Sequence, residues 1–302
     1  MKKLIGLVLA LTLICFTVPV HAFNEPFLNL GLTNFMDASP GPGWYLTEYA
    51  YFHFADELKD GDGHELPGDN DLDIAASVTQ IVYHSNVKFL GGNPGLDLLL
   101  PIAHIDFDND LLGIEGQGGV GDLLVGPFIQ WGPNMVFGRP YFQRFEFQIL
   151  TPTGEHDNDH AINPGSGFWS IDPYYSFTYF ITPKLETSWR IHYLWNAEKD
   201  NSGGRPDIQA GQAIHFNYAI DYAFTNSFRA GIAGYYLKQI TEDEADGHNI
   251  SDSEEQVFAI GPGLVWHINK DLTFMAAVNF EMAAEARPEG VASTLRLIWK
   301  FW

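Results

Sequence analysis

The feature that most constrains the fold of this chain is an alternation of apolar and polar side chains over unusually long segments. Residues 184–196 show it most clearly, because mostly apolar or aromatic side chains occupy every second position and polar or charged ones lie between them. A period of two is typical of a β-strand with one apolar and one polar face. Residues 139–151, 209–224 and 290–302 repeat the pattern. A soluble β-sandwich alternates in the same way, so the period alone leaves a soluble and a membrane protein open.

The length of these segments favours a membrane protein. Strands of soluble proteins usually run about 5–6 residues, whereas a tilted strand that crosses a bilayer needs about 9–11. The strand-like segments here are each about 11–16 residues long. We count twelve of them, at 44–55, 72–87, 96–107, 120–131, 139–151, 167–181, 184–196, 209–224, 227–240, 255–267, 271–282 and 290–302.

The connections between these segments alternate between short and long. The short ones carry turn residues such as Gly, Pro and Asn and fall near 88–95, 132–138, 182–183, 225–226 and 268–270. The long ones hold 27 of the 38 acidic residues and fall near 56–71, 106–122, 152–166, 197–208, 241–255 and 283–290. An even-stranded barrel with tight turns at one rim and long loops at the other produces this rhythm.

The sequence therefore predicts an all-β fold, an antiparallel transmembrane β-barrel over residues 44–302. We expect about 12 strands, short periplasmic turns and long acidic extracellular loops, and counts of ten or fourteen strands stay open.

The N-terminus indicates export. Lys2 and Lys3 precede an apolar stretch from Leu4 to Val20, and Val20-His21-Ala22 provides a cleavage motif of the small-x-small type. We interpret residues 1–22 as a signal peptide that is cleaved, which places the mature chain in the bacterial outer membrane. Residues 23–43 follow as an N-terminal segment that is too apolar for a free tail. This segment either folds into the lumen as a plug or lies against the periplasmic rim.

Composition argues against several classes of function. A formal net charge of −22 repels the phosphates of nucleic acid, so we expect no nucleic-acid partner. The single cysteine, Cys15, lies in the signal peptide, which rules out a disulfide or a cysteine zinc site in the mature chain. Ser188 and His192 share one strand face, but no Gly-x-Ser-x-Gly elbow accompanies them. We expect neither an enzyme nor a cofactor.

Short motifs in a fixed order give the chain a family resemblance. In sequence order they are Gly119-Val120-Gly121-Asp122 leading into Leu123–Trp131, Thr151-Pro152-Thr153-Gly154-Glu155, Asn163-Pro164-Gly165-Ser166-Gly167-Phe168-Trp169, Gly211-Gln212-Ala213-Ile214-His215, Lys238-Gln239 and Gly261-Pro262. Together they resemble the outer-membrane family named for the meta-pathway of phenol degradation. The resemblance implies a transporter β-barrel linked to aromatic or hydrocarbon compounds, and it supplies no catalytic residues.

Charged residues in the middle of predicted strands identify the lumen. A charge in mid-strand cannot face lipid without a large cost, so we expect it to face the interior. There it would either line a pore that screens solutes or join structural ion pairs in a narrow lumen, and both alternatives stay open for a barrel of this size. The lumen-lining candidates are Arg144, Glu146, Glu186, Arg190, Asp221, Arg229, Glu281 and Arg296.

A cation site on a loop is a weaker hypothesis. The run Glu155–His160 brings carboxylates and imidazoles together, and a divalent cation could take ligands from His156, Asp157, Asp159 and His160. A solvated loop tip is the simpler interpretation, so no metal site is assigned. The acidic loops as a group could hold divalent cations that bridge to anionic lipopolysaccharide.

Two functions of different classes agree with these features. The first is an outer-membrane channel through which small solutes, aromatic or hydrophobic compounds among them, diffuse passively. The second is a non-conducting barrel with a structural or surface-binding role. The expected partners are outer-membrane lipid, lipopolysaccharide and a small-molecule solute, while the identity of the solute and the oligomeric state stay open.

Overall fold

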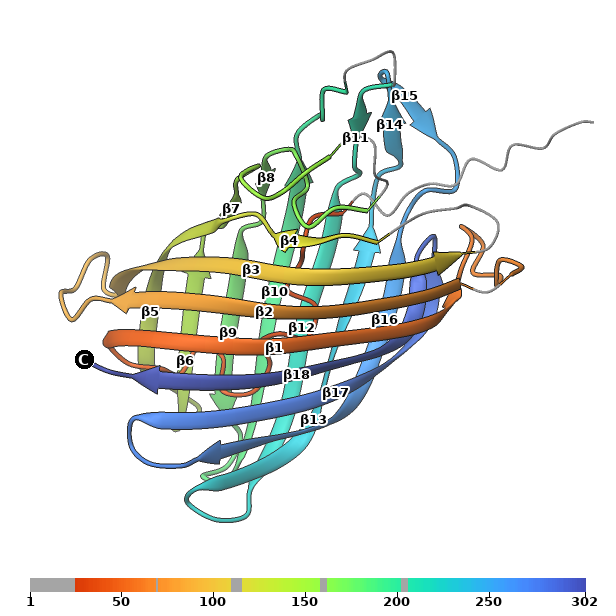
Figure 1. Cartoon of the computed structure of the whole chain (residues 1–302). Coiled ribbons are helices and arrows are strands. Elements are labelled where there is room, and N and C mark those ends of the chain that lie inside the picture. The colour runs from red at the N-terminus through yellow and green to blue at the C-terminus, as the bar shows by residue number, and fades with distance from the viewer. Residues whose placement is uncertain (1–24, 69, 110–115, 158–161, 202–205) are drawn as a thin grey trace, which may run out of the picture.

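Long strands wind around a common axis and close on themselves (Figure 1). The computed structural model describes residues 25–302 except 69, 110–115, 158–161 and 202–205. Over the described residues it forms a closed antiparallel β-barrel of 12 strands. In the order in which they pair around the wall, these strands are β1 (Gly43–Leu58), β2 (Asn70–His84), β3 (Asn93–Asn109), β5 (Leu124–Val136), β6 (Arg139–Glu146), β9 (Tyr174–Phe180), β10 (Leu185–Asn196), β12 (Ala213–Ala223), β13 (Phe228–Gln239), β16 (Gln256–His267), β17 (Leu272–Glu285) and β18 (Pro288–Lys300). Pairing of β1 with β18 closes the wall.

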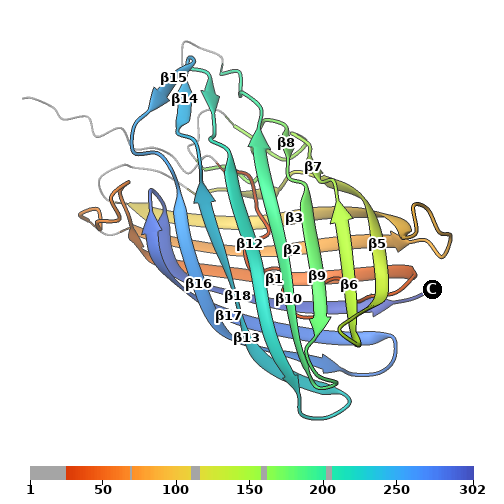
Figure 2. The ribbon, with the colours of Figure 1, turned by 180° about the vertical axis from the view of Figure 1, so that it is seen from behind.

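Short strands extend one end of the barrel. β7 (Ile149–Leu150) pairs with β5 and β8, β8 (Ser170–Ile171) also pairs with β10, and β4 (Gly118–Val120) pairs with β3. A separate three-stranded sheet of β11 (Ile208–Gln209), β14 (Asp243–Ala245) and β15 (His248–Ile250) projects beyond the wall at the same end, as the two opposite views show (Figures 1 and 2). We call this end the loop rim and the opposite end, where both Gly43 and Lys300 lie, the turn rim.

The prediction of a barrel with about 12 strands is confirmed, and each of the twelve sequence segments overlaps one of its strands. Two segments are interrupted. The predicted strand at 139–151 divides into β6 and β7, and that at 167–181 divides into β8 and β9. The second break falls at Asp172-Pro173, where proline has no N–H to contribute to the strand ladder.

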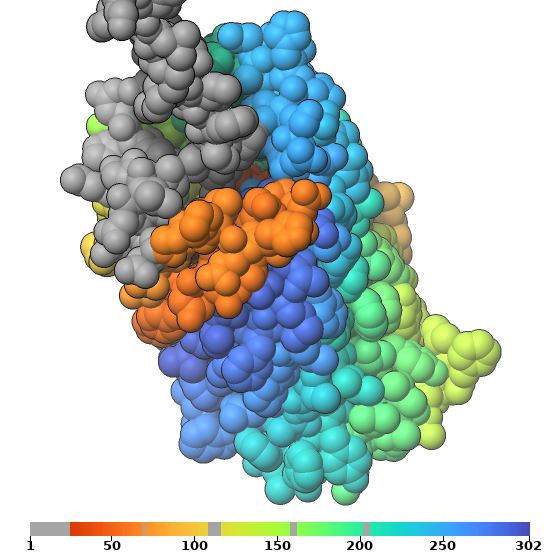
Figure 3. Space-filling view, turned by 90° about the vertical axis from the view of Figure 1, so that its right-hand side faces the viewer, coloured from red at the N-terminus to blue at the C-terminus, as the bar shows by residue number. Residues whose placement is uncertain are grey.

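One predicted long loop is wrong. The window 283–290 is a tight hairpin instead, because β17 continues to Glu285 and β18 begins at Pro288. Ala283 and Ala286 adopt left-handed backbone conformations with φ of 56° and 53°, which turn the chain within a few residues. Two backbone hydrogen bonds join this hairpin to the β1–β2 connection. The Lys59 N–H donates to the Arg287 carbonyl at 3.0 Å, and the Ala286 N–H donates to the Asp60 carbonyl at 2.8 Å. Figure 3 shows the two connections side by side, the first in dark blue and the second in orange.

The strand faces follow the alternation in the sequence. In β10, Glu186, Arg190 and His192 are buried inside the barrel, whereas Ile191 and Tyr193 are 44% and 41% exposed on its outer surface. This is the reverse of a soluble β-sandwich, where the apolar face is the buried one. An apolar exterior is what a strand needs when its outer face contacts lipid. Among the described residues, no helix is long and apolar enough to cross a membrane.

Residues 25–42, which we call the N-terminal segment, run inside the barrel rather than along its outside. Leu32 and Phe35 of this segment are buried. Leu32 packs with Tyr49 and Val78 of the wall, and Phe35 packs in a second cluster with inward-facing residues of β12, β13, β16 and β17. Gly31 lies so close to Tyr235 that a Cβ there would approach the ring to 2.9 Å, and its φ of 77° also favours glycine. The wall and the segment are therefore closely packed against each other.

Candidate functional site in the barrel lumen

All eight charged side chains singled out in the sequence lie at inward-facing strand positions. Six of them are at most 6% exposed, and the Glu281 carboxylate, at 1%, is equally enclosed. Arg296 is half-buried and lies with its guanidinium 5.1 Å from the centroid of the Tyr49 ring. Whether these side chains line a route for solutes stays a prediction.

Most of the enclosed charges are paired with an opposite charge. Arg229 and Asp221 form an ion pair on neighbouring strands. Glu281 lies 2.8 Å from His53 and accepts a 2.7 Å hydrogen bond from the Tyr235 hydroxyl. Burying a charge without a partner would be very costly, so ion pairs of this kind are what a filled interior requires.

Arg144 and Glu146 share a polar network on β6. The guanidinium of Arg144 donates to Gln130 Oε1 at 2.9 and 2.7 Å, and it lies 3.5 Å from the Glu146 carboxylate. Glu146 also accepts a hydrogen bond from the Tyr174 hydroxyl at 2.7 Å. The Arg144 guanidinium sits 4.0 Å from the centroid of the Phe128 ring. Each polar group is thus held in one orientation by several neighbours.

Arg190 has a partner that strand patterns could not reveal. Its Nε and Nη2 atoms each donate to one oxygen of Asp37, both at 2.7 Å, in a bidentate pair. Asp37 belongs to the N-terminal segment, 153 residues away in the sequence. The guanidinium also stacks over the Tyr174 ring at 4.0 Å. Because a bidentate pair fixes both distance and orientation, this contact holds the segment at one place on the wall.

Further hydrogen bonds attach the backbone of the N-terminal segment to the wall. The N–H of Met36 donates to Glu186 at 3.1 Å, that of Ala38 to Thr178 at 3.2 Å, and that of Gly31 to Asn217 at 2.9 Å. The Gln130 amide donates back to the carbonyl of Pro40 at 2.6 Å. Since a chain without regular secondary structure leaves its backbone groups unpaired, these wall side chains supply the missing partners.

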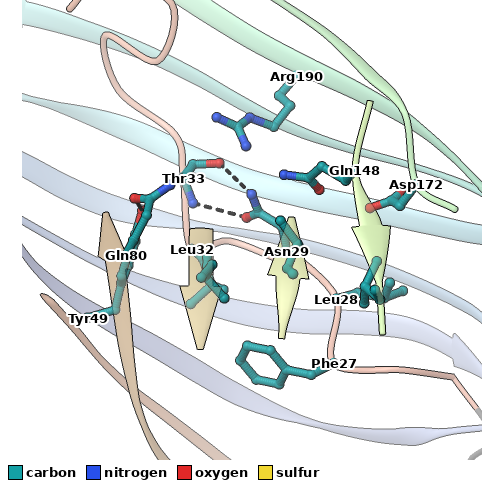
Figure 4. A pocket seen from close by; sticks show the side chains of 13 residues that line it. Phe27, Leu28, Asn29, Leu32, Thr33, Tyr49, Gln80, Gln148, Asp172 and Arg190 are labelled. Atoms are coloured by element: carbon teal, nitrogen blue, oxygen red, sulfur yellow. Dashed lines mark hydrogen bonds between the residues drawn. The ribbon is translucent and has the colours of Figure 1, made fainter. Parts of the chain in front are cut away.

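Two small cavities remain beside the segment. One, of about 20 Å³, lies between the segment and the wall, where Asn29 and Thr33 of the segment bond to each other and lie near Gln148, Asp172 and Arg190 (Figure 4). The other, of about 70 Å³, is lined mainly by apolar side chains around Tyr51 and Leu72. The first holds about one water molecule and the second only a few, so the described part of the segment leaves little space at these two places.

Acidic side chains are also buried near the loop rim, outside the membrane-spanning strands. Burial raises the pKa of Glu255 to about 8, although the Arg287 guanidinium, 3.3 Å away, acts to lower it. Asp243 acts in the same direction as burial. Glu25, in the N-terminal segment, likewise has a raised pKa because of burial and the nearby Glu255 and Asp243 carboxylates. The loop rim therefore gathers carboxyl groups around the start of the segment, and the raised pKa values of Glu25 and Glu255 favour their neutral acid forms.

The motifs that carry the family resemblance meet at the loop rim. Asp122 accepts hydrogen bonds from the Gly154 N–H at 2.8 Å, and from the N–H and hydroxyl of Ser166 at 2.7 and 2.5 Å. A Cβ on Gly154 would lie 2.8 Å from Gly165, so the two backbones approach too closely for larger residues. Residues from three separate motifs thus form one clamp, which has a structural role.

The loop cation site and the pair Ser188 and His192 are the weaker hypotheses from the sequence. In the loop run, His156 Nδ1 is 2.9 Å from the Gly165 carbonyl and the Asp157 N–H donates to Asn163 at 2.8 Å, while Asp159 and His160 lie outside the described residues. The Ser188 hydroxyl donates to Glu186 at 2.8 Å. Within the described part of the chain, no hydrogen bond joins Ser188 to His192, as a serine nucleophile would need.

Comparison with one solved structure supports the fold. The chain resembles an outer-membrane channel from Pseudomonas putida F1 with a TM-score of 0.78 and 16% sequence identity, over 87% of this chain and 96% of that one. The β domain of the Bordetella autotransporter BrkA gives 0.49 and 11%, over 87% and 100%. A mutant of the monoaromatic hydrocarbon channel TodX gives 0.49 and 8%, over 87% and 90%. No curated protein sequence matches the chain.

The resemblance inferred from the short motifs is confirmed by a family model. That model matches residues 55–297, which cover all twelve barrel strands at least in part, and its description is "Putative MetA-pathway of phenol degradation". With its motif clamp, its twelve-stranded wall and this match over most of its length, the chain belongs to the family of that description.

Proposed function

We propose that the protein is an outer-membrane channel through which small solutes, aromatic and hydrophobic compounds among them, diffuse passively. One observation carries the proposal: the closed barrel is apolar outside and polar inside. Such a wall is stable in a bilayer and encloses a route that charged and polar side chains line. Membership of a family named for phenol degradation supports aromatic compounds as solutes.

The N-terminal segment acts in this proposal as a plug. It occupies the lumen and is hydrogen-bonded to wall strands that include β5, β9, β10 and β12. Because the cavities beside it measure only about 20 and 70 Å³, a molecule the size of phenol passes only when the segment moves. The cavities are lined by both aromatic and polar side chains, such as Phe27, Tyr49 and Gln80 (Figure 4). That mixture suits a solute with an aromatic ring and a hydroxyl group.

Single-channel recording tests the proposal. We expect the purified protein in a planar bilayer to show discrete conductance steps, and liposomes that contain it to take up phenol-sized solutes faster than empty liposomes. A preparation heated until its gel mobility shifts is the control, because it contains the same chain without the barrel. Uptake and conductance equal to this control would overturn the channel proposal.

A non-conducting barrel is the second candidate, because the lumen holds the N-terminal segment. Buried apolar side chains such as Phe35, together with the ion pairs around them, resemble the packed interior of a small structural barrel. In this case the acidic loops would bind divalent cations that bridge to lipopolysaccharide. Silent bilayers combined with calcium-dependent binding of lipopolysaccharide would favour this second function.

The orientation in the membrane follows from the two rims. We propose that the signal peptide is removed, that the turn rim, where Gly43 and the C-terminal end of β18 lie, faces the periplasm, and that the acidic loop rim, where the N-terminal segment begins at Glu25, faces outward. An epitope inserted at Gly247, which has φ of 72° and open space around it, should then bind antibody on intact cells. The same epitope at Asn226, in a tight turn at the other rim, should bind only after the membrane is opened. The opposite labelling would reverse the orientation.

A further inference from the structure

A cluster of one carboxylate and two imidazoles lies inside the barrel, apart from the ion pairs described above. His192 and His215 are directly opposite each other in the β10–β12 register, and Asp172 follows β8. Asp172 Oδ2 is 2.9 Å from His192 Nδ1, and Asp172 Oδ1 is 3.2 Å from His215 Nε2. All three residues are buried, and one nitrogen or oxygen of each lies within 4.8 Å of those of the other two.

The two histidines each keep a polar atom without a hydrogen-bond partner. These atoms are His192 Nε2 and His215 Nδ1, and both are enclosed. Buried nitrogen atoms of this kind almost always find a partner in protein or water. Here each is the second nitrogen of its ring, the first being the one beside Asp172, so it is the atom that would carry the N–H of a metal-bound imidazole. The two rings are stacked, with their centroids 4.1 Å apart.

We propose that Asp172, His192 and His215 bind a divalent transition-metal ion of the Zn²⁺, Co²⁺ and Ni²⁺ class. Imidazole nitrogen with a carboxylate oxygen is a ligand set for this class, whereas Ca²⁺ and Mg²⁺ prefer oxygen alone. Two ligands of a tetrahedral ion, each about 2.0–2.1 Å from it, lie roughly 3.3 Å apart. The observed N···O separations of 2.9 and 3.2 Å are close to that spacing. The lone pair of an imidazole nitrogen lies in the plane of its ring, so two parallel rings cannot both direct a lone pair at one ion. Binding therefore tilts one imidazole out of the stack.

The charges around the cluster agree with a bound cation. Arg190, on the same face of β10, is compensated by its bidentate pair with Asp37. The carboxyl groups of Glu25 and Asp172 are both buried and interact electrostatically, and a cation bound at Asp172 would reduce the repulsion between them whenever both are ionised. Asp172 also lines the 20 Å³ cavity beside the N-terminal segment (Figure 4). A water molecule in that cavity could complete the coordination of the ion.

Cobalt absorption tests the site in the full-length protein in detergent. Titration with Co²⁺ should give a visible ligand-field band that saturates at one equivalent and that Zn²⁺ removes. His192→Ala and His215→Ala should abolish the band, and Asp172→Asn should weaken Co²⁺ binding at least about tenfold. Two controls should keep the band: His84→Ala, which removes another buried histidine, and His156→Ala with His160→Ala, which removes the loop histidines.

The fold of each variant is checked by the shift of its gel mobility on heating. For variants that fail this check, the wild type gives a second measurement, because Zn²⁺ should raise its midpoint of thermal unfolding, and at the same Zn²⁺ concentration it should raise that of Asp172→Asn less. A wild type without the cobalt band would overturn the proposal. So would a band that survives both histidine substitutions, or a band lost only in the loop-histidine control.

Discussion

Replacing Asp37 with Ala is expected to free the N-terminal segment and to raise the conductance of the barrel several-fold. Asp37 and Arg190 are both buried, and their bidentate pair is a strong contact between the segment and the wall. Removing one partner of a buried pair leaves the other charge uncompensated, at a cost of about 3–5 kcal/mol. Because each 1.4 kcal/mol changes an equilibrium about tenfold, the undocked state should become at least about a hundredfold more populated. Planar-bilayer recording measures the change as time spent in the larger conductance state.

Asp97→Ala is the matched control for this substitution. It removes the same kind of side chain from an equally buried inward position, but its hydrogen-bond partner is Gln80 of the wall. A second readout needs no conductance. Cys15 is the single cysteine of the sequence, so a Cys15→Ala background removes it whether or not the signal peptide is cleaved. In that background Leu32→Cys, buried in the segment, should react with a water-soluble maleimide faster when Asp37 is Ala. Equal currents and equal labelling in the Asp37 and Asp97 variants would show that this pair does not hold the segment.

A double substitution separates the pair from its single members. Removing Arg190 together with Asp37 takes away the uncompensated charge, so the combined loss of docking should be smaller than the sum of the two single losses. A purely additive result would contradict the interpretation of Arg190 and Asp37 as one coupled contact.

The strands could be predicted from the sequence because one physical requirement repeats along the chain. Each spanning strand must present apolar side chains to lipid and can keep polar ones inside, so Ile191 and Arg190 differ in character because they differ in face. The hairpin at residues 286–287 escaped prediction for a related reason. Pro288, Glu285 and Glu289 are typical of loops, yet here they flank a tight turn.

The contacts inside the lumen could be predicted only in part. The alternation predicts which strand side chains face inward. It does not predict their partners, which depend on the strand register and on segments whose sequence shows no alternation. Asp37 reaches Arg190 because the N-terminal segment enters the barrel. His192 and His215 face each other only in the register that the β10–β12 pairing sets, and Asp172 joins them from a break between two strands. None of these contacts produces a local pattern in the sequence.

Replacing Ile191 with Arg is expected to destabilise the barrel by about 2–4 kcal/mol, the range for a basic side chain on the lipid face at mid-bilayer depth. Ile191 lies near the middle of β10 and is 44% exposed on the outer surface. Arg190, one residue earlier, is buried inside, so the two neighbouring positions test the facing directly. The free energy of unfolding can be measured by denaturant titration of the protein in lipid vesicles, with tryptophan fluorescence as the probe.

A position at a different depth in the membrane provides the control for Ile191→Arg. Ile181 is 40% exposed but lies at the turn rim, just beyond β9, so Ile181→Arg should cost only about 0–1 kcal/mol because the new side chain reaches the membrane interface. Ile191→Leu, which keeps the site apolar, should cost less than about 1.5 kcal/mol. If Ile191→Arg unfolds at the same denaturant concentration as Ile181→Arg, then the outer face of β10 does not contact the hydrocarbon core. In that case both the orientation of this wall and the membrane location that rests on it would have to be abandoned.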